Sequence, residues 1–310
     1  MLKTYADDYK YAKNFIKSFN IYNSDDITLF VLIPEKDTTF FSEFKSKTVI
    51  IISEETIPVS YFEHPINGIS KGYLNQQIVK LAFWKLGLCV NYLCVDSDAL
   101  FIRNFGIKDF MTPHGYPYSV LIEDRDLQCD PEYFSAQWQN RSESLAKIQE
   151  FLEPESNLIL QTCHNFQILS TPILAKMQVE ILDRKGLTYI DLLTISPYEF
   201  SWYNYFLQGL NIKIYTREPF FKMYGSPRQL IRDRVVGLTL EDLARGYLGI
   251  IINSNLGKNR QTPLIYDEPL HHILAQYISL PILFSSFMWG MKRLPAIARQ
   301  RILKAKSDAP

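Results

Sequence analysis

The stretch YLCVDSDALFIR, residues 92–103, decides the fold of this chain. Four largely apolar residues, Tyr92–Val95, run directly into a short polar motif that contains Asp96 and Asp98, and Ala99–Ile102 are apolar again. A short, continuous apolar run is typical of a strand that is buried on both faces of a parallel sheet. The stretch therefore predicts two carboxylates at the end of a buried strand.

The residues before this stretch alternate between strand-like and helix-like patterns. Apolar runs at Leu29–Ile33 and Val49–Ile52 predict two more buried strands, and Leu2–Tyr5 predicts a short first strand. Apolar residues recur at helical spacing over Asp8–Phe19 and Tyr73–Trp84, which predicts helices there. This alternation predicts a doubly wound α/β fold, with a mostly parallel central sheet flanked by helices. Ligands of such folds bind beyond the carboxyl ends of the strands.

The composition narrows the class of protein. With 310 residues and 47% hydrophobic content, the chain can bury the core of one large domain or of a domain with an appendage. Lys and Arg together number 33, as do Asp and Glu, so no net charge attracts nucleic acid. The four cysteines form no C-x-x-C pair and the N-terminus has no leader pattern, so we expect a reducing, cytoplasmic location. Residues 123–154 are polar, and we expect them to cross the surface as a flap beside the site.

The two aspartates suit a divalent cation. In extended backbone, side chains at i and i+2 share a face, so Asp96 and Asp98 would face one point while Ser97 points away. Mg²⁺ and Mn²⁺ are commonly held by one or two carboxylates, with substrate phosphates and water as the other ligands. A cation that bridges a diphosphate stabilises the charge that develops when the bond to the phosphate breaks. Carboxylates in so apolar a stretch are also costly unless they are paired or bound to metal.

Two other interpretations of the same aspartates are tested by spacing. A calcium EF-hand that begins at Asp96 needs Gly at its sixth position and Glu at its twelfth, where this chain has Phe101 and Ile107. A phosphatase with an aspartate nucleophile would carry the motif after its first strand and an acidic cluster far downstream. Asp96 follows two strand-helix units, and the acidic cluster at 123–126 comes too soon. The EF-hand is excluded, and the phosphatase stays a minor alternative.

The region from Gly72 to Arg103 resembles the core of the GT-A-fold glycosyltransferases. It is most similar to a bacterial branch that is often associated with surface polysaccharide synthesis. Ser196–Leu207 and Gly246–Ser254 also resemble that branch. The resemblance implies a GT-A-like domain over residues 1–270. It also implies transfer of a sugar from a nucleotide-diphosphate donor to a saccharide or lipid-linked acceptor.

The resemblance also implies which residues contact the donor. By position these are Thr4, Tyr5, Gln76, Gln77, Lys80, Asp96 and Ser97, with Asp96 and Asp98 as the ligands of Mn²⁺ or Mg²⁺. Thr4 and Tyr5 would line the nucleotide pocket at the end of the first strand. The alternative for Lys80, given equal weight, is that it is an exposed helix residue with no role in donor binding. Gln76 lies one turn before it on the same face. Members of the family commonly add a late histidine to the metal shell, and no motif selects one of the five histidines here.

An inverting transfer needs a general base that takes the proton of the acceptor hydroxyl. Glu199 follows Ser196 and Pro197 at a predicted helix N-terminus, where free amides stabilise a carboxylate. Many inverting GT-A enzymes have their base in a comparable segment, so Glu199 is the candidate and Asp191 is the second choice. The alternative is that Glu199 only caps the helix.

The C-terminal segment, residues 271–310, is predicted to be a helical appendage. Ile273–Met291 contains no charged residue, and the residues after it are basic. This pattern favours a helix that lies on the cytoplasmic face of the inner membrane and binds anionic lipid. A buried homodimer contact is the alternative. A further alternative for the whole chain is a catalytically silent GT-A scaffold that binds a partner enzyme through this segment.

Overall fold

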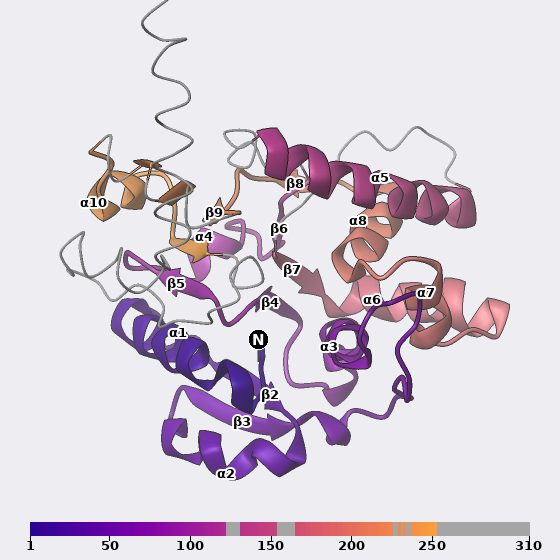
Figure 1. Ribbon diagram of the computed structural model, residues 1–310, viewed down its shortest axis with the longest axis horizontal. Helices are drawn as coiled ribbons and strands as arrows, with labels where there is room; N and C mark the ends of the chain where they lie inside the picture. The colour runs from indigo at the N-terminus through magenta and orange to yellow at the C-terminus, as the bar shows by residue number, and fades with distance from the viewer. Residues whose placement is uncertain (122–130, 154–164, 226–228, 231, 234–236, 253–310) are drawn as a thin grey trace, which may run out of the picture. The chain divides into compact units, whose positions relative to one another are not determined.

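A five-stranded sheet lies at the centre of the computed structural model (Figure 1). Its strands are β1 (Leu2–Lys3), β2 (Leu29–Ile33), β3 (Val49–Ser53), β4 (Asn91–Val95) and β7 (Phe166–Ser170). They lie in the order β3-β2-β1-β4-β7, and all neighbours are parallel except β7, which is antiparallel to β4. The predicted α/β fold with a mostly parallel central sheet is therefore confirmed.

The structure describes residues 1–121, 131–153, 165–225, 229–230, 232–233 and 237–252. All of these residues belong to one compact unit, Met1–Asn253. The predicted boundary at residue 270 and the predicted appendage 271–310 lie outside the described residues.

Helices cover both faces of the central sheet. On one face, α1 (Tyr9–Tyr22) contributes Phe15 and Ile16 to a core that also contains Val31 of β2. The other face carries α3 (Lys71–Ala82), α6 (Thr171–Met177), α7 (Tyr189–Ile195) and α8 (Glu199–Gly209). Figure 1 shows α1 and α3 on opposite sides of the strands. The two apolar cores together hold the sheet between two helical layers.

Local sequence explains where helix α3 begins and ends. The hydroxyl of Ser70 accepts a hydrogen bond from the Tyr73 amide at 3.3 Å, which satisfies one of the free donors of the first turn. After Ala82 the chain tightens into a 3₁₀ turn, and Gly87 ends it with a left-handed φ of 67°. The predicted helix and its glycine stop are therefore confirmed.

Two smaller sheets extend the central one. β5 (Ala99–Phe101), β9 (Phe221–Tyr224) and β10 (Gly249–Ile252) lie in the order β5-β10-β9, with β10 antiparallel to β5 and parallel to β9. β6 (Tyr118–Ser119) and β8 (Tyr215–Thr216) form a parallel pair. Gly249 is needed for the close approach, because a Cβ atom there would lie 2.4 Å from the Leu100 carbonyl oxygen.

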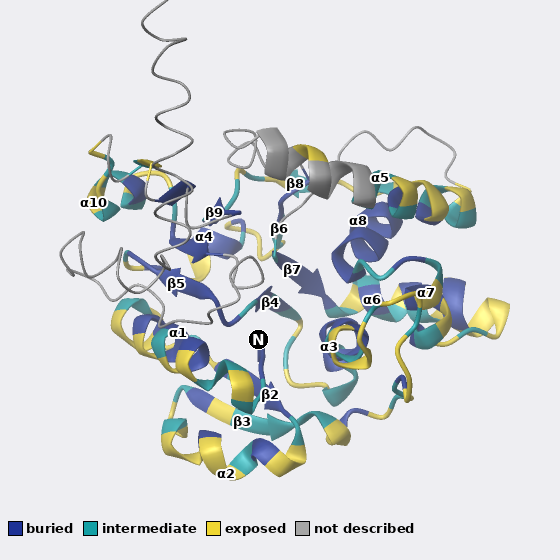
Figure 2. Cartoon of the chain, in the orientation of Figure 1, coloured by how far each residue is buried: buried dark blue, intermediate teal, exposed yellow. Residues whose placement is uncertain are grey.

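α8 is buried along most of its length (Figure 2). It packs against α3, β7 and a further helix, α5 (Pro131–Leu152). We predicted that residues 123–154 form a polar surface flap, and for residues 131–152 this is wrong because they form α5. Leu145 and Ile148 are buried one turn apart and give this polar helix an apolar contact face. Residues 122–130 lie outside the described part of the chain.

The remaining described elements are short. They are α2 (Thr38–Phe41), α4 (Ile107–Phe110), α10 (Leu240–Ala244), 3₁₀ turns at Ala6–Asp8, Glu35–Asp37, Ser42–Phe44, Glu54–Thr56 and Phe83–Leu86, and a π-helical turn at Gln178–Asp183. Among the helices that the structure describes, none has the length and apolarity needed to cross a membrane.

Candidate functional site

The Asp-Ser-Asp motif forms a turn between two sheets. β4 ends at Val95, the Ala99 amide donates to the Asp96 carbonyl at 3.2 Å, and β5 begins at Ala99. Our prediction that the motif continues as extended backbone is therefore wrong. The chain turns because it leaves the five-stranded sheet and enters the three-stranded one. The motif is also tied to β10, since the Ile252 amide donates to the Asp98 carbonyl at 3.3 Å.

The two aspartates of the motif differ in exposure. The side chain of Asp96 is 24% exposed, whereas Asp98 is 8% exposed and Ser97 is also buried. Buried carboxylates need compensating charge or hydrogen bonds. Asp96 therefore presents the more accessible oxygens of this turn.

Lys80 of α3 links two carboxylates from distant parts of the chain. Its Nζ atom lies 2.8 Å from Oδ1 of Asp96 and 3.0 Å from Oε1 of Glu199. The side chain is buried, and Nζ lies 5.0 Å from the centroid of the Phe200 ring. The Tyr92 hydroxyl donates to the Lys80 carbonyl at 2.9 Å and ties α3 to β4. These contacts define the Lys80 cluster: Lys80, Asp96 and Glu199.

The two carboxylates keep the Lys80 ammonium charged. Burial alone would lower the pKa of Lys80, but the negative charges of Asp96 and then Glu199 outweigh it. The pKa of Lys80 is therefore raised above its ordinary value. A buried ion pair of this kind is weak evidence for stability, since desolvation offsets much of its attraction. The alternative that Lys80 is an exposed helix residue is wrong.

The site-facing side of α3 is polar. Gln76 and Gln77 lie four and three residues before Lys80, so each of them neighbours Lys80 on the helix surface. Nε2 of Gln76 donates to Oδ1 of Asp96 at 3.4 Å, so Gln76 joins the Lys80 cluster at its edge. Gln77 is buried, and its Oε1 atom has no hydrogen-bond partner among the described residues.

Glu199 is the first residue of α8, as predicted. The N-cap residue is Tyr198, which makes no side-chain capping bond, and the Glu199 carboxylate reaches Lys80 instead of staying with its own helix. The two residues are 119 positions apart in sequence. Sequence reasoning selected each of them separately but gave no signal that they form a pair.

Asp191 lies in a different environment. It is the third residue of α7 and forms a capping box with Thr188, whose amide and hydroxyl donate to Oδ2 of Asp191 at 2.8 and 2.7 Å. These hydrogen bonds lower the pKa of the exposed Asp191 carboxyl. The structure therefore brings Glu199 to Lys80 and Asp96, and it uses Asp191 to begin a helix.

A second buried ion pair lies at the end of β1. Nζ of Lys3 lies 2.5 Å from Oε2 of Glu54, which follows β3, and it also donates to the Thr4 carbonyl. Burial is the largest effect on Glu54 and raises the pKa of its carboxyl, against the opposing effect of Lys3. Thr4 is buried, and its hydroxyl has no hydrogen-bond partner within the described residues. Tyr5, the next residue, is half-buried. Sequence reasoning singled out Thr4 and Tyr5 but missed Lys3 and Glu54.

The Asp-Ser-Asp turn contains two carboxylates, the type of side chain that holds a hard cation. Within residues 1–252, apart from the stretches that the structure leaves out, no three His, Cys, Asp or Glu side chains are grouped as metal ligands. A Mg²⁺ or Mn²⁺ site with Asp96 and Asp98 as its protein ligands would take its other ligands from substrate phosphates and water. Carboxylate oxygens are the hard ligands that such an open site needs. His64 and His114 are exposed, and the other three histidines lie outside the described residues.

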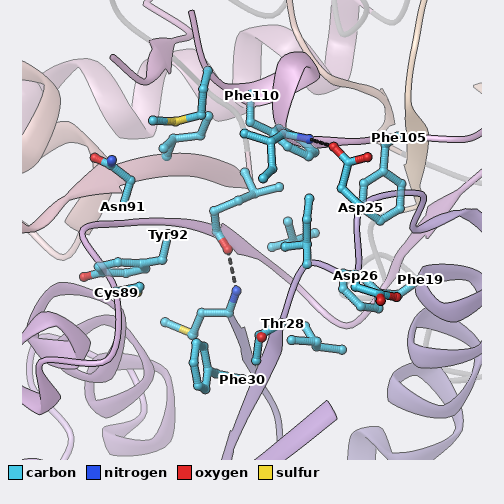
Figure 3. Close-up of a pocket in the computed structure, with 18 of the residues that line it drawn as sticks. Phe19, Asp25, Asp26, Thr28, Phe30, Cys89, Asn91, Tyr92, Phe105 and Phe110 are labelled. Carbon is cyan, nitrogen blue, oxygen red and sulfur yellow. Dashed lines mark hydrogen bonds between the residues drawn. The ribbon is translucent and has the colours of Figure 1, made fainter. Parts of the chain in front are cut away.

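An apolar pocket lies at the opposite edge of the central sheet (Figure 3). Its volume is about 450 Å³, and it is lined by the first residues of β2 and β4, Leu29 and Asn91, and by aromatic rings such as Phe105 and Phe110. Figure 3 shows Asn91 and Tyr92 on one side of it and Asp25 and Phe105 on the other. Asp96 and the Lys80 cluster do not line this pocket.

Three solved structures similar to the chain are glycosyltransferases, the class that its sequence resembles. Mouse xyloside xylosyltransferase 1, in its apo form, has a TM-score of 0.44 and 11% identity, over 85% of this chain and 98% of that chain. The galactosyltransferase LgtC, in complex with donor and acceptor sugar analogs, has a TM-score of 0.42 and 14% identity, over 92% and 98%. The bifunctional glycosyltransferase WbbM has a TM-score of 0.46 and 12% identity, over 83% and 45%.

The comparison of sequences gives a family. No curated protein matches the chain. A family model, described as a family of unknown function, matches residues 2–229, which is more than half of the chain. The chain therefore belongs to this family, DUF6492.

Proposed function

We propose that this chain is a metal-dependent glycosyltransferase that transfers a sugar from a nucleotide-diphosphate donor. The observation that carries the proposal is the Lys80 cluster, with its 2.8 Å and 3.0 Å contacts, beside the Asp-Ser-Asp turn. The turn follows β4 at the carboxyl edge of a parallel sheet, where ligands of α/β folds bind. Buried charges of both signs at such an edge are typical of a functional site.

Asp96 and Asp98 would hold Mn²⁺ or Mg²⁺ together with the donor diphosphate. The cation supplies a Lewis acid for the charge that develops on the departing phosphate. Lys80 and Gln76 stand beside Asp96 and offer hydrogen-bond donors to phosphate or sugar oxygens. Ser97 lies between the two aspartates in the same turn. Gln77, three residues before Lys80 in α3, carries a buried carbonyl oxygen that a donor hydroxyl could satisfy.

Thr4 and Tyr5 would contact the nucleoside. They directly follow β1, which is the neighbour of β4 in the sheet, so both strands end at the same edge. The buried Thr4 hydroxyl, which has no hydrogen-bond partner in the described part of the chain, is the polar atom here that a ligand could satisfy. Tyr5 adds an aromatic ring suited to a flat base.

Glu199 is the proposed general base. Its Oε1 atom would take the proton of the acceptor hydroxyl while that oxygen bonds to the anomeric carbon and the bond to the donor phosphate oxygen breaks. Glu199 is buried in the same cluster as Asp96. The Lys80 ammonium therefore links Asp96, on the donor side of the proposed site, to Glu199, on the acceptor side. Asp191 remains the second candidate, although its capping bonds and lowered pKa make it a weaker base.

The acceptor is proposed to be a saccharide or a lipid-linked saccharide of bacterial surface polysaccharide synthesis. The apolar run 273–291 and the basic residues after it support a membrane contact at the cytoplasmic face. Flotation of the native chain with anionic vesicles, compared with a chain that lacks residues 273–310, tests this contact. Equal flotation of both chains would contradict it and would favour the homodimer contact.

Calorimetric titration with a panel of nucleotide diphosphates tests the activity class. We expect binding that requires Mn²⁺, disappears with chelator and is lost in Asp98→Asn. Circular dichroism of the variant must match the native protein, because Asp98 is buried. Folded protein that binds none of the nucleotides would contradict the proposal and favour a silent scaffold or a phosphatase.

A further inference from the structure

The Lys80 ammonium occupies Oδ1 of Asp96, one of the two carboxylate oxygens that Asp96 offers to a cation. We infer that Lys80 is the resting counter-ion of the cation site: it competes with the divalent cation for Asp96 and couples cation binding to Glu199. The inference rests on the proposed function and adds a sequence of events to it. In the resting site Lys80 pairs with both carboxylates, and cation binding transfers Asp96 from Lys80 to the metal.

The geometry makes the competition direct. Oδ1 of Asp96 already accepts from Nζ of Lys80 at 2.8 Å and from Gln76 at 3.4 Å. A Mg²⁺ or Mn²⁺ ion that bound this same oxygen, at about 2.1 Å, would lie at most about 5 Å from the ammonium. Two positive charges at that distance in a partly buried site repel strongly. A cation that takes Oδ1 must therefore displace Lys80 or turn the Asp96 carboxylate.

The charge balance of the site indicates where the Lys80 ammonium moves when a cation binds. Together with Asp98 of the neighbouring turn, the Lys80 cluster has three carboxylates and one ammonium, which leaves two negative charges for one divalent cation to balance. Glu199, whose Oε1 lies 3.0 Å from Nζ in the resting site, would hold the ammonium after cation binding. A donor diphosphate then brings new negative charge beside Lys80. Movement of Lys80 toward the diphosphate would release the Glu199 carboxylate for the acceptor hydroxyl.

A purely structural role for Lys80 makes a different prediction. A lysine that only ties α3 to β4 and α8 would leave the affinity for a cation unchanged, or would lower it when removed, because the site would lose its shape. If Lys80 competes with the cation, its removal should raise the affinity of the site for the cation. The direction of the change in affinity therefore separates the two roles.

The experiment is titration of the full chain with Mn²⁺ alone, without nucleotide, with free Mn²⁺ measured by electron paramagnetic resonance. We expect Lys80→Gln to bind Mn²⁺ at least about tenfold more tightly than the native chain, because the repelling charge is gone. Lys47→Gln is the matched control, since Lys47 pairs with Asp26 on the surface at 3.5 Å. It should bind Mn²⁺ as the native chain does.

A second variant protects the test from misfolding. Lys80→Gln leaves two carboxylates without their buried partner, which destabilises proteins strongly. Lys80→Met combined with Glu199→Gln removes one charge of each sign and keeps the net charge of the cluster. Tighter Mn²⁺ binding by this double variant would therefore report competition for Asp96 and not a change in overall charge.

The outcomes separate the inference from the proposed function. Native-like Mn²⁺ affinity in both Lys80 variants, with binding lost in Asp98→Asn, would overturn the competition and leave the metal-dependent transferase intact. No Mn²⁺ binding in any folded variant would overturn both the competition and the metal site.

Discussion

The two edges of the central sheet differ in what they bury. The amino edge, before β1 and at the starts of β2 and β4, has an apolar pocket of about 450 Å³ walled by phenylalanine rings. Its ion pair, Lys47 with Asp26, is exposed. The carboxyl edge buries two ion-pair groups, Lys3 with Glu54 and the Lys80 cluster.

This difference separates stability from function within one sheet. Apolar burial stabilises a fold by about 25 cal/mol per Å² and needs no partner of fixed geometry. Buried charges gain little net stability, so a fold that keeps several at one edge is better explained by a ligand that uses them. Changes at the amino edge should therefore affect folding, and changes at the carboxyl edge should affect binding and transfer.

The largest expected effect is on Asp98, in the turn of the Asp-Ser-Asp motif. Asp98→Asn should lower the transfer rate by about a thousandfold, because a metal Lewis acid contributes several kcal/mol to such a reaction. The rate of sugar release from a nucleotide-sugar donor with Mn²⁺ measures this loss. Asp26→Asn, at the amino edge, is the matched control and should leave the rate unchanged. Equal rates for all three proteins would remove the distinction between the edges.

A substitution at the amino edge should show the opposite pattern. Phe105 is buried, and its ring lies 4.0 Å from that of Phe101 between centroids. Phe105→Ala should lower the free energy of unfolding by about 3 to 5 kcal/mol, as large-to-small changes in a core do. Urea denaturation measures the loss, and Mn²⁺ binding by the folded variant should be native. A loss of Mn²⁺ affinity in the folded variant would show that the two edges are coupled.

Glu199→Gln should affect transfer without preventing donor binding. We expect the rate to fall by about a hundredfold, within the range of a lost general base. Metal-dependent nucleotide binding should persist, because Asp96 and Asp98 are intact. Calorimetry and rate measurements on one preparation check both. A native rate would mean that Glu199 only holds Lys80 in place.

Much of the fold could be predicted from the sequence because the patterns that indicate its strands and helices are local. The apolar runs Leu29–Ile33 and Val49–Ile52 predicted two strands of the central sheet, and the polar-apolar spacing before Gly87 predicted α3. The antiparallel β7 at the edge of the sheet depends on pairing with β4 across more than 70 residues, which periodicity does not report. α5 was missed because its composition is polar, although Leu145 and Ile148 are buried.

The sequence predicted individual residues of the candidate site but not their contacts with one another. Asp96 and Glu199 were singled out from local patterns and the resemblance, and Lys80 from the resemblance alone. The 2.8 Å and 3.0 Å contacts depend on how α3, β4 and α8 pack. The turn at Asp96 could not be predicted from alternation, because β5 leaves the central sheet to pair with β10. Lys3 and Glu54 gave no pattern at all, since each is an ordinary charged residue next to a strand.

The smallest expected effect is on Asp191, the second candidate base. Asp191→Asn removes a capping carboxylate and should lower the free energy of unfolding by about 1 kcal/mol or less, with little change in transfer rate. The native pKa of Asp191 is lowered by Thr188, so its contribution to stability is present above the ordinary aspartate pKa of about 3.9 and is lost as pH falls through the lowered value. The difference in melting temperature between native and variant should therefore be seen at neutral pH and shrink in acid. A large loss of transfer rate with unchanged melting temperature would instead make Asp191 the base and leave Glu199 as the partner of Lys80.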